Sequence, residues 1–113
     1  MSMRPRLKAE IWVMAHIRRC FAADMPAFLR RRGDADAGGI LLKINGFEAG
    51  CMVLEPTTDL SGGRAWLRAT GKTPVDEARA EEVLAARLKN DPDLWVLEIE
   101  DPEGRHQLDE PVL

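Results

Sequence analysis

Apolar residues recur every three or four positions near the start of the chain and again after its middle. Over residues 7–23 this spacing predicts a helix that buries one apolar stripe. The stripe consists of Leu7, Ile11, Met14, Ile17 and Phe21, and Val13 and Cys20 widen it. A second helix is predicted from Thr73, as its N-cap, to about Lys89. Pro74 suits the first helical position, and the Asn-Asp-Pro sequence at 90–92 ends the helix.

Alternating and β-branched runs outside these helices predict the strands of a sheet. Residues 28–32 and 40–45 are predicted to form a hairpin, because the glycines and aspartates of residues 33–39 favour a turn. Further strands are predicted at residues 51–55 (ended by Pro56), 64–70, 94–100 and, after a type I turn, 105–108. The order α-β-β-β-β-α-β-β predicts an α+β fold. We expect two layers, with a mostly antiparallel sheet of about five strands and both helices packed on one face.

Composition excludes several classes of protein. The chain has 113 residues, 45% of them hydrophobic and 31% charged, and we expect a single domain over residues 1–113. Its longest nearly apolar window, residues 11–17, is far shorter than the roughly 20 apolar residues that span a bilayer, so no membrane partner is expected. Cys20 and Cys51 have no CxxC spacing and indicate a reduced, cytoplasmic protein.

Charge is distributed unevenly along the chain, although the net charge is only −3. Residues 1–45 carry nine Lys or Arg against four acids, and residues 46–113 carry seven against fifteen. The simpler interpretation is that the two halves pair within one fold; an anionic partner for the basic half is the alternative. A nucleic-acid-associated protein would use Arg18, Arg19 and the cluster that begins at Arg30. The pI of about 5.4 and the absence of Tyr argue against nucleic acid.

Two short motifs suggest chemistry that the rest of their pattern does not support. Gly-Lys-Thr at 71–73 resembles the end of a phosphate-binding loop, but Trp66 stands where that loop needs its first glycine. A capped helix start explains the tripeptide better. His16 and Cys20 are one helical turn apart, a spacing open to a nucleophile–base pair or to two metal ligands. With no third group in sight, a surface histidine beside a buried cysteine is the simpler interpretation.

Glu98 and Glu100 share one face of their predicted strand and form the densest acidic group with neighbouring aspartates. Paired carboxylates hold divalent metals or share a proton, which would fit a small metal-dependent, hydrolase-like enzyme. Arg31, Lys43 and Arg68 on other strands would instead form a cross-strand charge ladder on the same exposed face, at about 0.2–1 kcal/mol per pair. We prefer the ladder, and predict no metal and no cofactor.

The charged residues around the predicted turn are the most distinctive feature of the sequence. Alternation places Arg30 and Arg32 on one strand face, and two neighbouring arginines grip a carboxylate or phosphate bidentately. The predicted binding residues are Arg31, Arg32, Asp34, Asp36, Asp93, Trp95 and Arg105. We therefore expect a non-enzymatic binding or interaction module with a charged site around the 30–39 hairpin turn. Its partner would be an unknown protein or a second copy that pairs through an edge strand.

Several longer motifs resemble those of a known family. They are E-I-W-V at 10–13, R-R-C at 18–20, R-R-G-D-A-D-A-G-G-I-L-L-K-I-N at 31–45, D-P-D-L-W-V-L-E-I-E-D at 91–101 and G-R-H at 104–106. Nearly end to end, the chain resembles an uncharacterised bacterial family catalogued as domain of unknown function 1491. The resemblance implies a compact single domain in a bacterial cytosol, and it carries over no activity.

Overall fold

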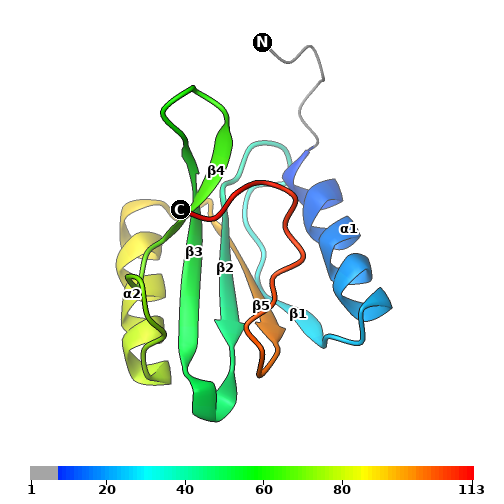
Figure 1. Cartoon of the computed structure of the whole chain (residues 1–113). Coiled ribbons are helices and arrows are strands. Elements are labelled where there is room, and N and C mark those ends of the chain that lie inside the picture. Colours follow the sequence, from blue (N-terminus) through cyan, green and yellow to red (C-terminus); the bar gives the residue numbers. More distant parts are fainter. Residues whose placement is uncertain (1–7) are drawn as a thin grey trace.

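The computed structural model describes residues 8–113 and contains two helices and a five-stranded sheet (Figure 1). The elements are α1 (Ala9–Ala22), β1 (Ala27–Arg31), β2 (Ile40–Asn45), the 3-10 helix η1 (Phe47–Ala49), β3 (Cys51–Thr58), β4 (Arg64–Arg68), α2 (Glu77–Asn90) and β5 (Trp95–Glu100). The strand order is β1-β5-β2-β3-β4, and among these described strands only the β2–β5 pair is parallel. The α+β class and the mostly antiparallel sheet are confirmed. No helix within residues 8–113 is long and apolar enough to cross a membrane.

β5 lies between β1 and β2, so the predicted hairpin between those two strands is wrong. It pairs antiparallel with β1, with Ile99 opposite Ala27, and parallel with β2, with Trp95 opposite Ile40. β5 is buried on both faces along nearly its whole length, and a strand of that kind belongs inside a sheet rather than at its edge. Residues 33–39 therefore cross the end of β5 as a loop instead of closing a tight turn.

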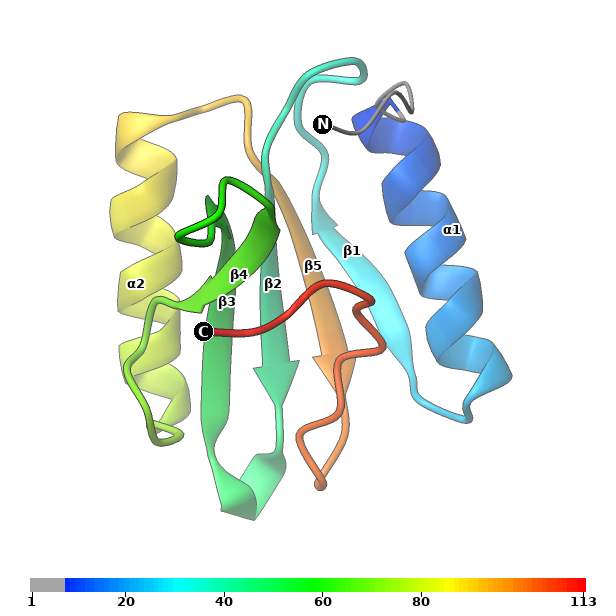
Figure 2. The ribbon, with the colours of Figure 1, turned by 45° about the horizontal axis from the view of Figure 1, so that its top comes forward.

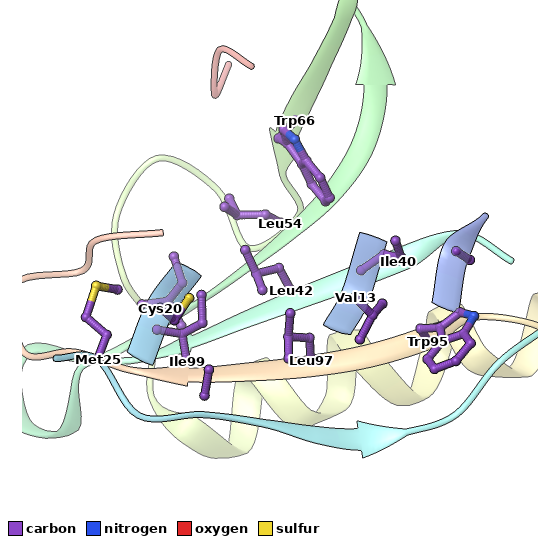
Figure 3. Close-up of a cluster of buried hydrophobic side chains, with 13 residues drawn as sticks. Val13, Cys20, Met25, Ile40, Leu42, Leu54, Trp66, Trp95, Leu97 and Ile99 are labelled. Carbon is purple, nitrogen blue, oxygen red and sulfur yellow. The ribbon is translucent and has the colours of Figure 1, made fainter. Parts of the chain in front are cut away.

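The two helices cover opposite faces of the sheet, so the prediction that both pack on one face is wrong (Figure 2). Neighbouring residues of a strand point to opposite faces. Leu42 packs in the cluster that includes Val13 of α1, whereas Leu41 packs in the cluster that includes Val83 of α2. Figure 3 shows the cluster on the α1 face. The physical reason is that β2 and β5 are apolar on both sides, and each side needs a cover.

α1 buries Val13 and Cys20 of the predicted apolar face but leaves most of the central stripe exposed. Ile11, Met14 and Phe21 of the predicted stripe are 53%, 44% and 59% exposed, and Leu7 lies outside the described residues. The buried residues of α1 are Ala9, Val13, His16 and Cys20. Three of these side chains are small, so this face lets the helix approach the sheet closely. The bulkier stripe is left along the side of the helix.

His16, predicted to lie at the surface, is buried among aromatic residues. Its ring stacks on Trp12 with the centroids 4.7 Å apart, and Trp12 in turn lies 5.8 Å from Trp66 of β4. Nε2 of His16 lies 2.8 Å from the carbonyl oxygen of His106. Because a carbonyl only accepts, Nε2 carries the proton and donates it. The hydrogen bond satisfies a polar ring that is 2% exposed.

The starts or ends of two elements differ from the prediction. β3 runs through Pro56 to Thr58, because beyond Leu54 it pairs with β4 alone and its free side tolerates a residue without an N–H. α2 begins after Asp76, whose carboxylate accepts the N–H of Arg79 at 2.8 Å. The predicted N-cap, three residues earlier, lies in a stretch that still pairs with the start of β3.

The C-terminal segment, residues 101–113, crosses the α1 face of the sheet and does not form the strand predicted at 105–108 (Figure 1). Asp101 is 3% exposed and accepts the N–H of Arg105 at 2.7 Å, which begins the segment with a turn. Its end is fixed to β4, where the N–H of Leu113 donates to the carbonyl oxygen of Trp66 at 2.7 Å. A β-bridge joins Trp66 to Val112.

Candidate functional site

The 33–39 loop completes the N-terminus of α1. The carbonyl oxygen of Ala35 accepts the N–H of Glu10 at 3.1 Å, and the carbonyl oxygen of Asp36 accepts the preceding N–H at 3.2 Å. The loop thereby satisfies donors that a helix leaves unpaired at its start. The carboxylate of Asp34 accepts a backbone N–H three residues on, at 2.8 Å, as aspartates in turns do.

Trp95 and Asp93 fix the same loop to the start of β5. Trp95 is fully buried, and its Nε1–H donates to the carbonyl oxygen of Asp34 at 2.7 Å. The N–H of Asp34 donates to the carbonyl oxygen of Asp93 at 2.9 Å. The guanidinium of Arg32 lies 5.2 Å from the centre of the Trp95 ring and forms an ion pair with Glu10 of α1. The loop, α1 and β5 are thus joined at one point.

The structure brings together six of the seven predicted binding residues, and Arg105 is the exception. Arg31 donates to a backbone carbonyl oxygen just before β5 at 2.8 Å, and Asp36 lies 3.6 Å from Lys8 in an exposed ion pair. Arg105 lies at the other end of β5, 2.9 Å from Asp101. The contacts of the six residues are internal to the fold. Their role in binding stays a prediction.

A second group of charges lies beneath α2, with Lys43 of β2 at its centre. Lys43 is 1% exposed, and its Nζ lies 2.8 Å from Glu77, 2.7 Å from Glu81 and 3.4 Å from Glu98. Arg30 of β1 lies 2.7 Å from Glu81 and 2.8 Å from Glu98. We call these five residues the ion cluster. They carry three negative and two positive charges and line an open depression of about 580 Å³.

The predicted charge ladder contained only two members of the ion cluster, Lys43 and Glu98, and missed Arg30 and both helix residues. Its other cations, Arg31 and Arg68, lie outside the cluster. Lys43 interrupts an apolar strand, which was the available signal, and it lies directly opposite Glu98. The prediction placed this face in solvent. In the structure α2 covers it and contributes Glu81.

Arg30 lies two residues after Phe28, which pairs with Glu98, so alternation directs it to the face that α2 covers. The register shift that follows Leu29 turns Arg32 to the α1 face instead. The prediction that these two arginines share a face is therefore wrong.

The ion cluster holds its groups in their charged forms. Burial by itself lowers the pKa of Lys43, but hydrogen bonds to Glu77 and Glu81 outweigh burial and raise this pKa to about 12. The hydrogen bond from Arg30 lowers the pKa of Glu81 to about 2. General acids and bases work best with a pKa near the working pH. Neither Lys43 nor Glu81 meets that condition near neutral pH.

The histidine–cysteine pair of α1 is likewise held in an unreactive form. Burial lowers the pKa of His16 and raises the pKa of the Cys20 thiol. Burial also raises the pKa of Cys51. A thiol attacks or binds metal as the thiolate, so both cysteines are held in the form that does neither. Within the part of the chain that the structure describes, no three His, Cys, Asp or Glu residues are placed to hold a metal ion.

The arginines considered for nucleic acid do not share a surface. Arg19 lies on α1 and pairs with Asp109 at 3.2 Å. Arg30 lies on the opposite face of the sheet, within the ion cluster. A groove that tracks a phosphate backbone needs its cations side by side, and these two groups are separated by the sheet.

An exposed apolar surface runs along α1 beside the edge strand β1. It consists of the exposed side chains of Ile11, Met14, Phe21 and Leu29 and of Ile17, which is partly buried against the core, and we call it the α1–β1 surface. Glu10 lies one turn before Met14 and reaches Arg32, which directly follows β1, so this side of the helix faces β1. Leu29 is 36% exposed on β1, which is the last strand of the sheet on that side. The sequence pattern identified this stripe but assigned it to the core.

Comparisons with known proteins identify similar chains. A model of the protein family of unknown function DUF1491 matches residues 7–109. The crystal structure of a DUF1491 family protein from Caulobacter crescentus is 36% identical, with a TM-score of 0.85 over 96% of this chain and 100% of that one. An NMR structure of a DUF1491 family protein from the same organism is 36% identical, with a TM-score of 0.83 over 97% and 99%. The solution structure of an A. tumefaciens protein is 28% identical, with a TM-score of 0.72 over 85% and 86%. No curated protein matches the chain.

Proposed function

Because the chain belongs to the DUF1491 family of proteins of unknown function, its role must come from its own surfaces, and we propose that it is a non-enzymatic interaction module that binds a second copy of itself. The binding face is the α1–β1 surface. The observation that carries this proposal is the exposure of the apolar stripe, in which Ile11, Met14 and Phe21 are 44–59% exposed along one helix. Single exposed apolar residues are ordinary, whereas a contiguous stripe marks an interface.

Charges on the stripe support a second copy as the partner. Glu10 and Arg18 lie four residues before and four residues after Met14. If two copies of α1 pack antiparallel about a two-fold axis at Met14, Glu10 of each copy lies opposite Arg18 of the other. Within residues 8–113 Arg18 forms no ion pair, so it is available for this contact. An isologous interface built this way is apolar at its centre and charge-matched at both ends.

The edge strand fits the same two-fold axis. The chain reverses between Ala22, the end of α1, and Ala27, the start of β1. Met14 lies about 12 Å back from Ala22 along the helix at 1.5 Å per residue, and Leu29 lies about 7 Å forward from Ala27 along the strand at 3.3 Å per residue. The two residues are therefore level to within about one helical turn. The register shift after Leu29 leaves only a short free edge for strand pairing, so the helix stripe supplies most of the contact.

The proposal that the module is non-enzymatic rests on protonation. Lys43 and Glu81 are held in their charged forms, with pKa values of about 12 and about 2. Cys20 and Cys51 are free and buried, with thiol pKa values raised by burial. Two free buried thiols also support the cytoplasm as the place where the module works.

The oligomeric state in solution tests this proposal. We expect the full chain to form a concentration-dependent dimer in sedimentation equilibrium, and Met14→Glu to raise the dimer Kd by about tenfold or more, because it buries four unpaired charged oxygens per dimer. Leu60→Glu is the matched control, since Leu60 is fully exposed on the β3–β4 loop. A chain that stays monomeric, or a dimer that Met14→Glu leaves intact, would overturn the proposal.

A charge swap tests the two-fold arrangement separately. Arg18→Glu and Glu10→Arg each place like charges opposite one another and should weaken the homodimer. An equimolar mixture of the two variants restores both ion pairs across a heterodimer, so association should recover in the mixture alone. Recovery supports the antiparallel pairing of α1. A mixture no tighter than either variant would rule that pairing out.

A further inference from the structure

A pocket beneath the C-terminal segment carries an inference independent of the dimer. It is bounded by the ends of β2 and β4, the start of β3 and the C-terminal segment, and its volume is about 360 Å³. We call it the C-terminal pocket. Small-molecule sites have volumes of roughly 300–1,000 Å³ with mostly apolar walls and a few polar groups. Its apolar lining includes Ile44, Met52 and Leu54, and its cationic and imidazole groups are Arg68, Lys72 and His106.

The two cations in the pocket have no carboxylate partners of their own. Neither Arg68 nor Lys72 forms an ion pair with any residue in the range 8–113. Among the described residues that line the pocket, Glu103 is the only acid, and it lies 3.4 Å from Arg105. Arg30 and Lys43, on the opposite face of the sheet, are by contrast both paired with carboxylates. The pocket thus combines two positive charges that have no carboxylate partner with an apolar wall.

His106 adds a directed donor to these two charges. Its Nδ1 accepts the N–H of Leu108 at 3.0 Å, which assigns the ring proton to Nε2. Burial, and then the charge of Arg68, lower the pKa of His106, so the ring is neutral at neutral pH. The Nε2–H of His106, the guanidinium of Arg68 and the ammonium of Lys72 thus line one pocket as three donor groups of the kind that an acidic group accepts from.

We propose that the C-terminal pocket binds a small organic anion, a carboxylate with an apolar body. The carboxylate pairs with Arg68 and Lys72 and accepts from His106, while the apolar body lies against Ile44 and Leu54. A polyphosphate does not match this pocket, because it would place further charge against the apolar wall and beside Glu103. The pocket is built from β2–β4 and the C-terminal segment rather than from the α1–β1 surface, so this site stands or falls independently of the dimer.

Hexanoate is the probe for the first experiment, because it combines one carboxylate with a short apolar chain. We expect saturable amide shifts in two-dimensional NMR spectra of the full chain, confined to the ends of β2–β4 and the C-terminal segment, with a Kd of about 1 mM or tighter. Hexanol, without the charge, and inorganic phosphate, without the apolar chain, are titrated in parallel. We expect neither to saturate in the range where hexanoate does.

Two variants and a matched control complete the test. Arg68→Gln and Lys72→Gln should each weaken hexanoate binding about tenfold to a hundredfold, the effect of one charge-assisted hydrogen bond. Lys89→Gln removes the same charge from the exposed end of α2 and should leave the affinity unchanged. The same spectra report whether each variant is folded. Absent or unsaturable shifts, equal shifts with hexanol or phosphate, or an equal loss with Lys89→Gln would each overturn the proposal.

Discussion

Gly33 and Gly38 lie against the backbone at the start of β5, and this contact explains two of the glycines of the 33–39 loop. A Cβ on Gly33 would lie 2.1 Å from the carbonyl oxygen of Asp93, and one on Gly38 would lie 2.5 Å from the same atom. A gap of that size forces backbone rather than a flexible side chain to move. Neither position therefore has room for a side chain, which explains why both are glycine.

Gly33→Ala should consequently destabilise the protein. We expect a loss of about 1–3 kcal/mol or more in the free energy of unfolding, the usual cost of overpacking, measured by urea denaturation. Gly39→Ala is the matched control, because a Cβ there would meet only the end of the Leu94 side chain at 3.0 Å. Equal stability of the two variants would show that the loop does not press against β5.

Single residues of the loop also show which structural causes could not be inferred from the sequence. The pattern identified Gly33, Asp34 and Asp36 as a turn, and Trp95 as a neighbour of that turn. It attributed the glycines to backbone conformation, whereas their cause is a strand that begins about sixty residues later in the sequence. Six of the seven predicted binding residues do converge, but convergence does not distinguish a ligand site from contacts that join a loop to a helix and a strand.

At the scale of elements, the ion cluster joins α2 to three strands. Lys43→Met should cost about 1.5–3 kcal/mol of stability, the usual contribution of a hydrogen bond between charged groups. The reason is that Glu98, 5% exposed, would keep Arg30 as its partner and lose Lys43. Lys89→Met, at the exposed end of α2, should change stability little. Similar urea midpoints for both variants would contradict a role for the cluster in holding α2.

A double variant tests whether Lys43 and Glu98 stabilise the protein as a pair or independently. Lys43→Met combined with Glu98→Leu replaces the buried pair by apolar side chains of similar size, an exchange that is often neutral or stabilising. The double variant should therefore be more stable than Lys43→Met alone. If the two losses simply add, the two residues do not act as a pair.

The elements also separate what is local in the sequence from what is not. The positions of all five strands and both helices follow from short patterns, and each was predicted to within a few residues. Which face α1 buries was not predictable, because two stripes of that helix have helical spacing and tertiary packing chose the one with the smaller side chains. The insertion of β5 between β1 and β2 depends on its burial on both faces, which only the assembled sheet decides.

At the scale of the whole molecule, the basic N-terminal half and the acidic C-terminal half are joined by ion pairs. Arg30 and Lys43 meet Glu81, and Arg19 meets Asp109. The charge asymmetry of the sequence is thus used in part inside the fold. Several of these ion pairs contain a group that gains or loses a proton as pH changes. The free energy of unfolding should therefore depend on pH, in the direction that each pKa shift determines.

The direction of each pKa shift determines whether the group lowers stability at acid pH (the acid limb) or at alkaline pH. Burial lowers the pKa of His16 and of His106, so below about pH 6.5 the unfolded chain binds protons first and stability falls. Glu81 acts in the same direction: its pKa falls from 4.5 to about 2, so its contribution is complete above pH 4.5 and is lost as pH decreases towards about 2. Lys43 acts at the other end, where its contribution is lost as pH rises from 10.5 through about 12.

The part of the acid limb below about pH 4.5 that belongs to Glu81 can be identified with a single variant. We expect urea denaturation of the wild-type chain to show greatest stability between about pH 6.5 and pH 9, since above pH 9.0 the unfolded state ionises Cys20 and Cys51 first. Glu81→Gln cannot ionise, so its stability deficit relative to wild type should be largest at neutral pH and shrink as pH falls from 4.5 towards 2. Glu82→Gln, on the exposed side of α2, should run parallel to wild type. If the deficit of Glu81→Gln stayed constant through the acid limb, the carboxylate of Glu81 would not be held ionised by Arg30 and Lys43, and α2 would have to be held on the sheet by apolar packing and its other ion pairs, such as that between Arg87 and Glu55.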